Sequence, residues 1–147
     1  MSESAGSGSG RIVVGIDGSD NSKQALRWAA KQAGYTGASL DIVAAWEFPT
    51  TYGWVALPDN EDYDFAGYAQ KSLDEAAAEV FGGDVPASLS SRVVQGHAAE
   101  VLVEASKGAE LLVVGSRGYG GFADALLGSV STYCVHHAHG PVTVVRP

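Results

Sequence analysis

Five short runs along this chain have the length and composition of strands. Most are rich in Val, Ile, Leu and Ala, and the first stops at the turn residues Asp17-Gly18-Ser19. Uninterrupted apolar runs of this length are typical of strands that are covered on both faces. The sequence therefore predicts strands at Arg11–Ile16, Leu40–Trp46, Leu89–Gln95, Leu111–Gly115 and Val142–Val145.

The segments between these runs carry apolar residues three or four positions apart, which is the spacing of one helical face. The first segment is expected to end at Gly34 and the second at Gly82-Gly83, since glycine commonly terminates helices. Shorter helices are expected at 98–105 and 130–137. Strands that alternate with helices predict a parallel sheet wrapped on both faces. Ligands of such sheets bind beyond the carboxyl ends of the strands, here after the first, second and fourth.

Two segments fall outside this alternation. Residues 1–10 form a Ser/Gly-rich tail without the features of a secretory signal, and the folded domain is expected at 11–147. The connection from Glu47 to Asp64 is long, acidic and aromatic. A solvated surface loop explains it, and a lid over a ligand is the open alternative.

Composition narrows the function classes. Nine Lys and Arg stand against 17 Asp and Glu, which gives a formal charge of −8 and no basic patch for a nucleic acid. No apolar run approaches the roughly 20 residues that cross a bilayer, so no membrane partner is expected. A single cysteine, Cys134, fits a reducing cytoplasm. We expect a soluble, cytoplasmic, single-domain protein.

A cluster of glycines follows the fourth strand directly. Four of the seven residues from Gly115 to Gly121 are glycines, and Gly128-Ser129 precedes the last helix. Clustered glycines allow the backbone to approach a ligand closely, and a helix start favours an anion. Arg117 and the Ser129 hydroxyl could also reach phosphate oxygens. The residues alone leave a second possibility open, a flexible connection with Ser129 as a simple N-cap.

Three familiar motifs do not explain this segment. The chain has no Gly-Lys pair, which excludes a standard Walker A loop. Gly118 to Ala123 fits G-x-G-x-x-A, but it follows the fourth strand and no acidic residue comes after Asp124, so NAD binding is rejected. Gly128-Ser129-Val130-Ser131 lacks the second glycine of a hydrolase elbow.

The spacing Gly115-x2-Gly118-x9-Gly128-Ser129 resembles the G-2x-G-9x-G-[S/T] signature of the universal stress protein (UspA-type) family, ATP-binding subgroup. The flanking segments VVGIDGSDNS, VVGSRGYGG, LLGSVS and PVTVVRP are similar too, so the likeness runs from about Arg11 to Pro147. It implies a five-stranded parallel sheet of order 3-2-1-4-5, an adenine-nucleotide alpha hydrolase-like α/β fold, with ATP at the carboxyl edge.

The resemblance also implies a set of nucleotide-binding positions. Gly15 and Asp17 would lie at the adenosine end and the backbone of Ala45 would face adenine, although an Asp at such a junction is often only a turn residue. The remaining positions would hold ribose and phosphates: Gly115, Ser116, Arg117, Gly118, Tyr119, Gly120, Gly121, Gly128, Ser129 and Val130. Mg²⁺ or Mn²⁺ would be carried on the phosphates, because the loop has no carboxylate cluster to hold a metal alone.

The resulting hypothesis is an ATP-binding, nucleotide-dependent regulator of the stress response with at most slow hydrolysis, since no nucleophile–base pair stands out. His136, His137 and His139 near the last helix are explained by its dipole better than by a metal. The last strand would form a sheet edge, so a homodimer is expected. An ATPase or nucleotidyl-transferring enzyme, and an AMP or cyclic AMP binding module, remain alternatives.

Overall fold

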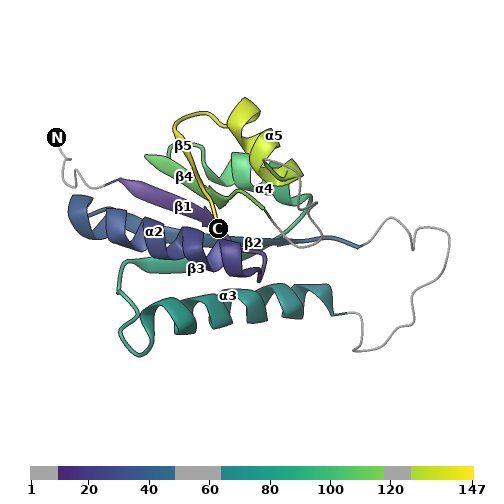
Figure 1. Cartoon of the computed structure of the whole chain (residues 1–147). Coiled ribbons are helices and arrows are strands. Elements are labelled where there is room, and N and C mark those ends of the chain that lie inside the picture. Colours follow the sequence, from purple (N-terminus) through teal and green to yellow (C-terminus); the bar gives the residue numbers. More distant parts are fainter. Residues whose placement is uncertain (1–9, 49–63, 118–126) are drawn as a thin grey trace.

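The computed structural model describes residues 10–48, 64–117 and 127–147. Within them the expected alternation is confirmed, and the order of all elements is visible in Figure 1. The bounds are β1 Arg11–Gly15, α2 Asp20–Thr36, β2 Ser39–Trp46, α3 Phe65–Phe81, β3 Leu89–Gln95, α4 Ala98–Ala105, β4 Leu111–Gly115, α5 Ser129–His137 and β5 Val142–Val145.

All five strands are parallel and lie in the order β3-β2-β1-β4-β5, as the family resemblance implied. In the register, Gly15 pairs with Val43 and Val14 pairs with Val113. The order reverses between β1 and β4, because β1 leads outward to β2 while β4 begins the other half. β3 and β5 are the two edge strands, so the expected edge position of the last strand is confirmed.

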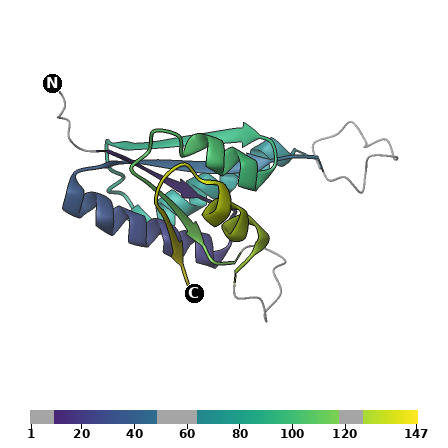
Figure 2. The same cartoon turned by 90° about the horizontal axis from the view of Figure 1, so that it is seen from above.

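The helices form two layers with a core on each side of the sheet (Figures 1 and 2). α2 and α3 cover one face, where Leu26, Ile42 and Leu73 are buried in one cluster. α4 and α5 cover the other face, where Leu102, Leu112 and Cys134 are buried in a second cluster. Burial on both sides explains why β1 and β4 are almost uniformly apolar.

The expected end of the first helix at Gly34 is wrong. α2 continues to Thr36, and Gly37 ends it with a φ of 79° while its N–H donates to the carbonyl of Ala33. A positive φ disfavours side chains, so glycine is strongly favoured where this helix ends. Gly34 lies in open helical surface, where a Cβ would meet nothing within 4 Å. The end of α3 at Gly82, by contrast, is confirmed.

The remaining expectations on organisation fall partly outside the described residues. The tail through Ser9, and positions 49–63 of the 47–64 connection, are not described, so the lid remains a hypothesis. In the described part of the chain, no helix combines the length and apolar character that crossing a bilayer requires.

Candidate functional site

The carboxyl ends of β1, β2 and β4 meet at one edge of the sheet, because parallel neighbours end on the same side. Gly15 ends β1, Gly115 ends β4, and Ala45 lies two positions beyond the Val43 partner of Gly15. A hydrogen bond of 2.6 Å from Gly128 N–H to the carbonyl of Ser116 brings the start of α5 to the end of β4. The sequence predicts nucleotide binding at this edge of the sheet, which we refer to as the carboxyl edge.

Asp17 shapes the turn between β1 and α2. Its Oδ1 accepts hydrogen bonds from the backbone N–H of Ser19, at 2.9 Å, and from the Ser19 hydroxyl. Ser19 in turn caps α2 by accepting from the N–H of Ser22 at 3.2 Å. The turn role anticipated for this aspartate is therefore present. The carboxylate of Asp17 is exposed, and its role at the adenosine end of the site stays a prediction.

The absence of a side chain at Gly15 is explained by packing. A Cβ at this position would lie 2.6 Å from Cδ1 of Leu102, a buried residue of α4. The absence of a side chain lets α4 approach the end of β1. A ligand is not needed to explain this glycine, and its predicted contact with adenosine is not tested.

Three backbone N–H groups of the predicted phosphate site donate within the protein. Ser116 N–H donates to the carbonyl of Val145 at 2.9 Å, and Arg117 N–H donates to Oδ1 of Asn21 at 2.8 Å. Gly128 N–H donates to Ser116, as described above. These three groups hold the edge together and are not available as donors to an anion. Gly118, Tyr119, Gly120 and Gly121 lie outside the described residues.

The N-terminus of α5 differs from these three hydrogen-bonded N–H groups. Gly128 is its N-cap, with φ −75° and ψ 171°, and no side chain caps the helix. Ser129 is thus the first helical residue, which corrects the alternative in which Ser129 was the cap. Among the described residues, no acceptor is found for the N–H groups of Ser129 and Val130. Free amides and the helix dipole together favour an anion at this point.

Sequence reasoning missed Asn21, which lies in the first turn of α2 and is buried at 8% exposure. Its Oδ1 accepts from Arg117 N–H and lies 3.4 Å from the Ser116 hydroxyl. Its Nδ2 donates to the carbonyl of Val145 at 3.1 Å and to Gln24 at 3.0 Å. No local pattern indicates this role, since the partners are up to 124 residues away.

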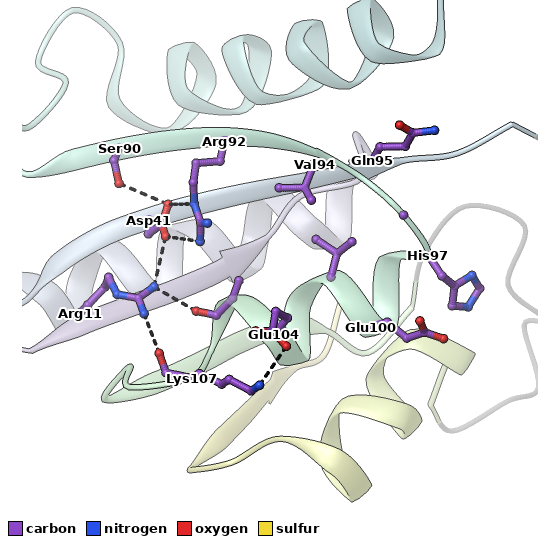
Figure 3. A pocket seen from close by; sticks show the side chains of 13 residues that line it. Arg11, Asp41, Ser90, Arg92, Val94, Gln95, His97, Glu100, Glu104 and Lys107 are labelled. Atoms are coloured by element: carbon purple, nitrogen blue, oxygen red, sulfur yellow. Dashed lines mark hydrogen bonds and ion pairs between the residues drawn. The ribbon is translucent and has the colours of Figure 1, made fainter.

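A groove of about 860 Å³ runs elsewhere, between β3 and α4 over β2 (Figure 3). None of the predicted nucleotide-binding residues lines it. Its floor holds Asp41, 3% exposed, whose Oδ2 lies 3.2 Å from Arg11 and 2.8 Å from Arg92. Ser90 donates to the same carboxylate at 3.2 Å. We refer to Arg11, Asp41, Ser90 and Arg92 as the ionic cluster.

Within the described ranges, no group of three or more His, Cys, Asp or Glu residues is arranged to hold a metal ion. His136 Nδ1 lies 2.9 Å from the carbonyl of Thr132 in its own helix, and the ring of His137 packs on Tyr133.

Burial raises the pKa of the Cys134 thiol to about 11, so this cysteine is a small apolar core residue at neutral pH.

One known protein family matches nearly the whole of this chain. The model of the universal stress protein family matches residues 8–146. This chain belongs to the universal stress protein family. The universal stress protein Rv2624c of Mycobacterium tuberculosis is 38% identical over 135 residues, which cover 92% of this chain and 47% of that protein. The chain thus spans about half the length of the curated relatives it matches.

Solved universal stress proteins share the fold. UspA from Lactobacillus plantarum matches with a TM-score of 0.76 at 23% identity, over 93% of this chain and 97% of the other. A universal stress protein in complex with cAMP matches at 29% identity with a TM-score of 0.62, over 92% and 95%. The Archaeoglobus fulgidus protein in complex with dAMP matches at 22% identity with a TM-score of 0.66, over 92% and 96%.

Proposed function

We propose that this chain binds an adenine nucleotide, with ATP as the physiological ligand, at the carboxyl edge. The observation that carries the proposal is the start of α5, where the N–H groups of Ser129 and Val130 have no acceptor among the described residues. The same segment completes the glycine signature of a family in which solved relatives hold cAMP and dAMP. Phosphate oxygens are the acceptors that such a helix start attracts.

In this proposal the chain recognises the phosphates mainly through uncharged donors. The Ser129 hydroxyl and the two amides of α5 donate to phosphate oxygens, and the exposed Arg117 adds a positive charge. Mg²⁺ or Mn²⁺ fits this site only when the phosphates carry it, because the described residues include no cluster of three or more His, Cys, Asp or Glu that could hold a metal. A metal carried in this way neutralises phosphate charge in a protein of formal charge −8.

The bound nucleotide acts in this proposal as a signal in a cytoplasmic stress response, and hydrolysis is slow. Partner choice would then depend on whether the site is filled. A homodimer forms through β5, an edge strand of four residues whose outer side pairs with no other strand of the described residues. Analytical ultracentrifugation is expected to show a dimer at micromolar concentration, and a monomer there would refute this part.

The phosphate role of α5 can be tested with one amide removed. Ser129 is the first helical residue, where proline is well tolerated, and the extended Gly128 before it suits a following proline. Ser129→Pro deletes an N–H and a hydroxyl, whereas the matched control Ser129→Ala deletes only the hydroxyl. We expect Ser129→Pro to weaken ATP binding about 10-fold or more in calorimetry, and Ser129→Ala to weaken it less. Equal affinity in all three proteins would contradict the proposal.

AMP or cyclic AMP is the second candidate ligand, favoured by the solved relative that holds cAMP at 29% identity. Calorimetry with ATP, AMP and cyclic AMP, together with mass spectrometry of molecules released from freshly purified protein, identifies the preferred nucleotide. An enzyme is distinguished by phosphate release. Turnover above about one per second, the low end for ordinary enzymes, would favour an ATPase or nucleotidyl-transferring enzyme.

A further inference from the structure

We infer that Asn21 is a positioning residue for nucleotide binding, which fixes the backbone at Ser116 and Arg117 where the chain leaves β4. The inference rests on the proposed function. Asn21 itself is 8% exposed and its side-chain oxygen and nitrogen are both engaged within the protein, so it acts through the backbone that it holds and not by touching the ligand.

The side chain of Asn21 joins three segments of the carboxyl edge. It extends from the first turn of α2, accepts from Arg117 N–H at 2.8 Å, and donates to the Val145 carbonyl at 3.1 Å. That carbonyl also accepts from Ser116 N–H at 2.9 Å. One amide group therefore fixes the end of β4 relative to both β5 and the start of α2.

An amide side chain satisfies both sides of this arrangement. The Arg117 N–H needs an acceptor, and the Val145 carbonyl receives a donor, so the residue between them must offer one of each. A carboxylate would supply only acceptors at neutral pH. The fit is close, since a Cβ on Gly115 would lie 2.7 Å from Oδ1 of Asn21. The first glycine of the family signature is therefore required here by an asparagine and not only by a ligand.

The consequence for binding follows from where this backbone leads. Ser116 and Arg117 stand at the start of the predicted phosphate segment, and the Ser116 carbonyl accepts from the N–H of Gly128, the N-cap of α5. Losing Asn21 removes the acceptor of Arg117 and loosens the segment that carries the guanidinium. In that variant, a ligand with phosphates must order this backbone when it binds, and the free-energy cost lowers its affinity. A ligand without phosphates does not need this backbone and keeps its affinity.

The test compares ATP with adenosine on Asn21→Ala. We expect ATP affinity to fall about 10-fold in calorimetry and adenosine affinity to change less than about 2-fold. Gln24→Ala is the matched control, because it removes the 3.0 Å partner of Asn21 Nδ2 and leaves the Arg117 link intact. It should change neither affinity. A general loss of structure would lower both affinities together, and that outcome, or no change in either, would overturn the inference.

A second measurement separates this inference from the proposed function. Hydrogen exchange by NMR on the wild-type protein without nucleotide should show the Arg117 N–H protected about 100-fold or more against the unfolded chain. Fast exchange of the Arg117 N–H overturns the role of Asn21, whichever ligand the protein binds. This measurement uses the wild-type protein, so it does not depend on whether Asn21→Ala folds. Protection of Arg117 in a wild-type protein that binds neither ATP nor adenosine would instead refute the proposed function.

Discussion

The ionic cluster and the carboxyl edge bury polar groups in opposite ways. At the cluster, one carboxylate, Asp41, meets two guanidinium groups at 2.8 and 3.2 Å, and both arginines remain partly exposed. At the edge, Asn21 and backbone amides make uncharged hydrogen bonds, and the fully buried Ser116 lies among them. The cluster lines the groove of Figure 3, whereas the edge carries the family signature.

This difference shows that a cavity and a set of charges do not by themselves identify a ligand site. The polar groups of the ionic cluster bond to one another and to the backbone, since Arg11 also donates to the carbonyls of Ala105 and Lys107 at 3.0 Å. It anchors β1, β2 and β3 to the end of α4. At the edge, the first N–H groups of α5 have no acceptor within the described part of the chain, and such groups favour an anionic ligand.

The largest effect is expected from removing both cations of the cluster. Arg11→Met with Arg92→Met leaves the 3% exposed Asp41 without a counter-charge, and the free energy of unfolding should fall by about 3 kcal/mol in urea denaturation. ATP affinity of the folded protein should not change. Adding Asp41→Asn to the double variant is expected to restore part of the stability, and a double variant as stable as wild type would show that the cluster is dispensable.

An intermediate effect is expected from Gly115→Ala at the edge. Its Cβ would lie 2.7 Å from Oδ1 and 2.8 Å from Cγ of Asn21, whose hydrogen bonds prevent it from moving away. Thermal unfolding should report a loss of about 2 kcal/mol, and ATP should bind more weakly. Gly15→Ala is the comparison, because its Cβ would meet only side-chain atoms of Leu102, at 2.6, 3.2 and 3.5 Å, and no backbone. If Gly115→Ala lost no more stability than Gly15→Ala, the close fit of Asn21 against Gly115 would be contradicted.

The smallest effect is expected at the C-terminal end of α2, away from both regions. Gly34→Ala should raise the free energy of unfolding by up to about 1 kcal/mol, because the new methyl meets no atom and alanine favours helix. Gly37→Ala should lower it, since φ there is 79°. Neither change should alter ATP affinity. A change in affinity with Gly34→Ala would mean that general stability, and not the local edge, controls binding.

The strands were the most predictable part of the fold. β3, β4 and β5 have the predicted bounds. Short apolar runs next to turn residues define β4 and β5 almost alone, whereas β3 carries polar residues at four of its seven positions. The helix end at Gly37 was missed because Gly34 and Gly37 are equivalent in the sequence pattern. Only the backbone distinguishes them, through the positive φ at Gly37.

The site could be predicted only as far as its signature. Gly115, Gly128 and Ser129 follow from a spacing, but Asn21 depends on contacts with residues 95 to 124 positions away. Asp41 has a faint signal, a carboxylate inside an apolar strand, and its partner Arg92 is 51 positions away. Side chains that hydrogen-bond to one another across a sheet produce no periodic pattern in the sequence, so the three-dimensional structure is needed to find them.

The carbonyl of Val145 accepts from both Ser116 and Asn21. During synthesis the ribosome makes Asn21 and Ser116 well before Val145, so the acceptor that both require emerges late. A nascent chain can pair its first four strands and still lack a finished nucleotide edge. Truncation before residue 142 removes this acceptor together with β5, so tight ATP binding is expected to be lost.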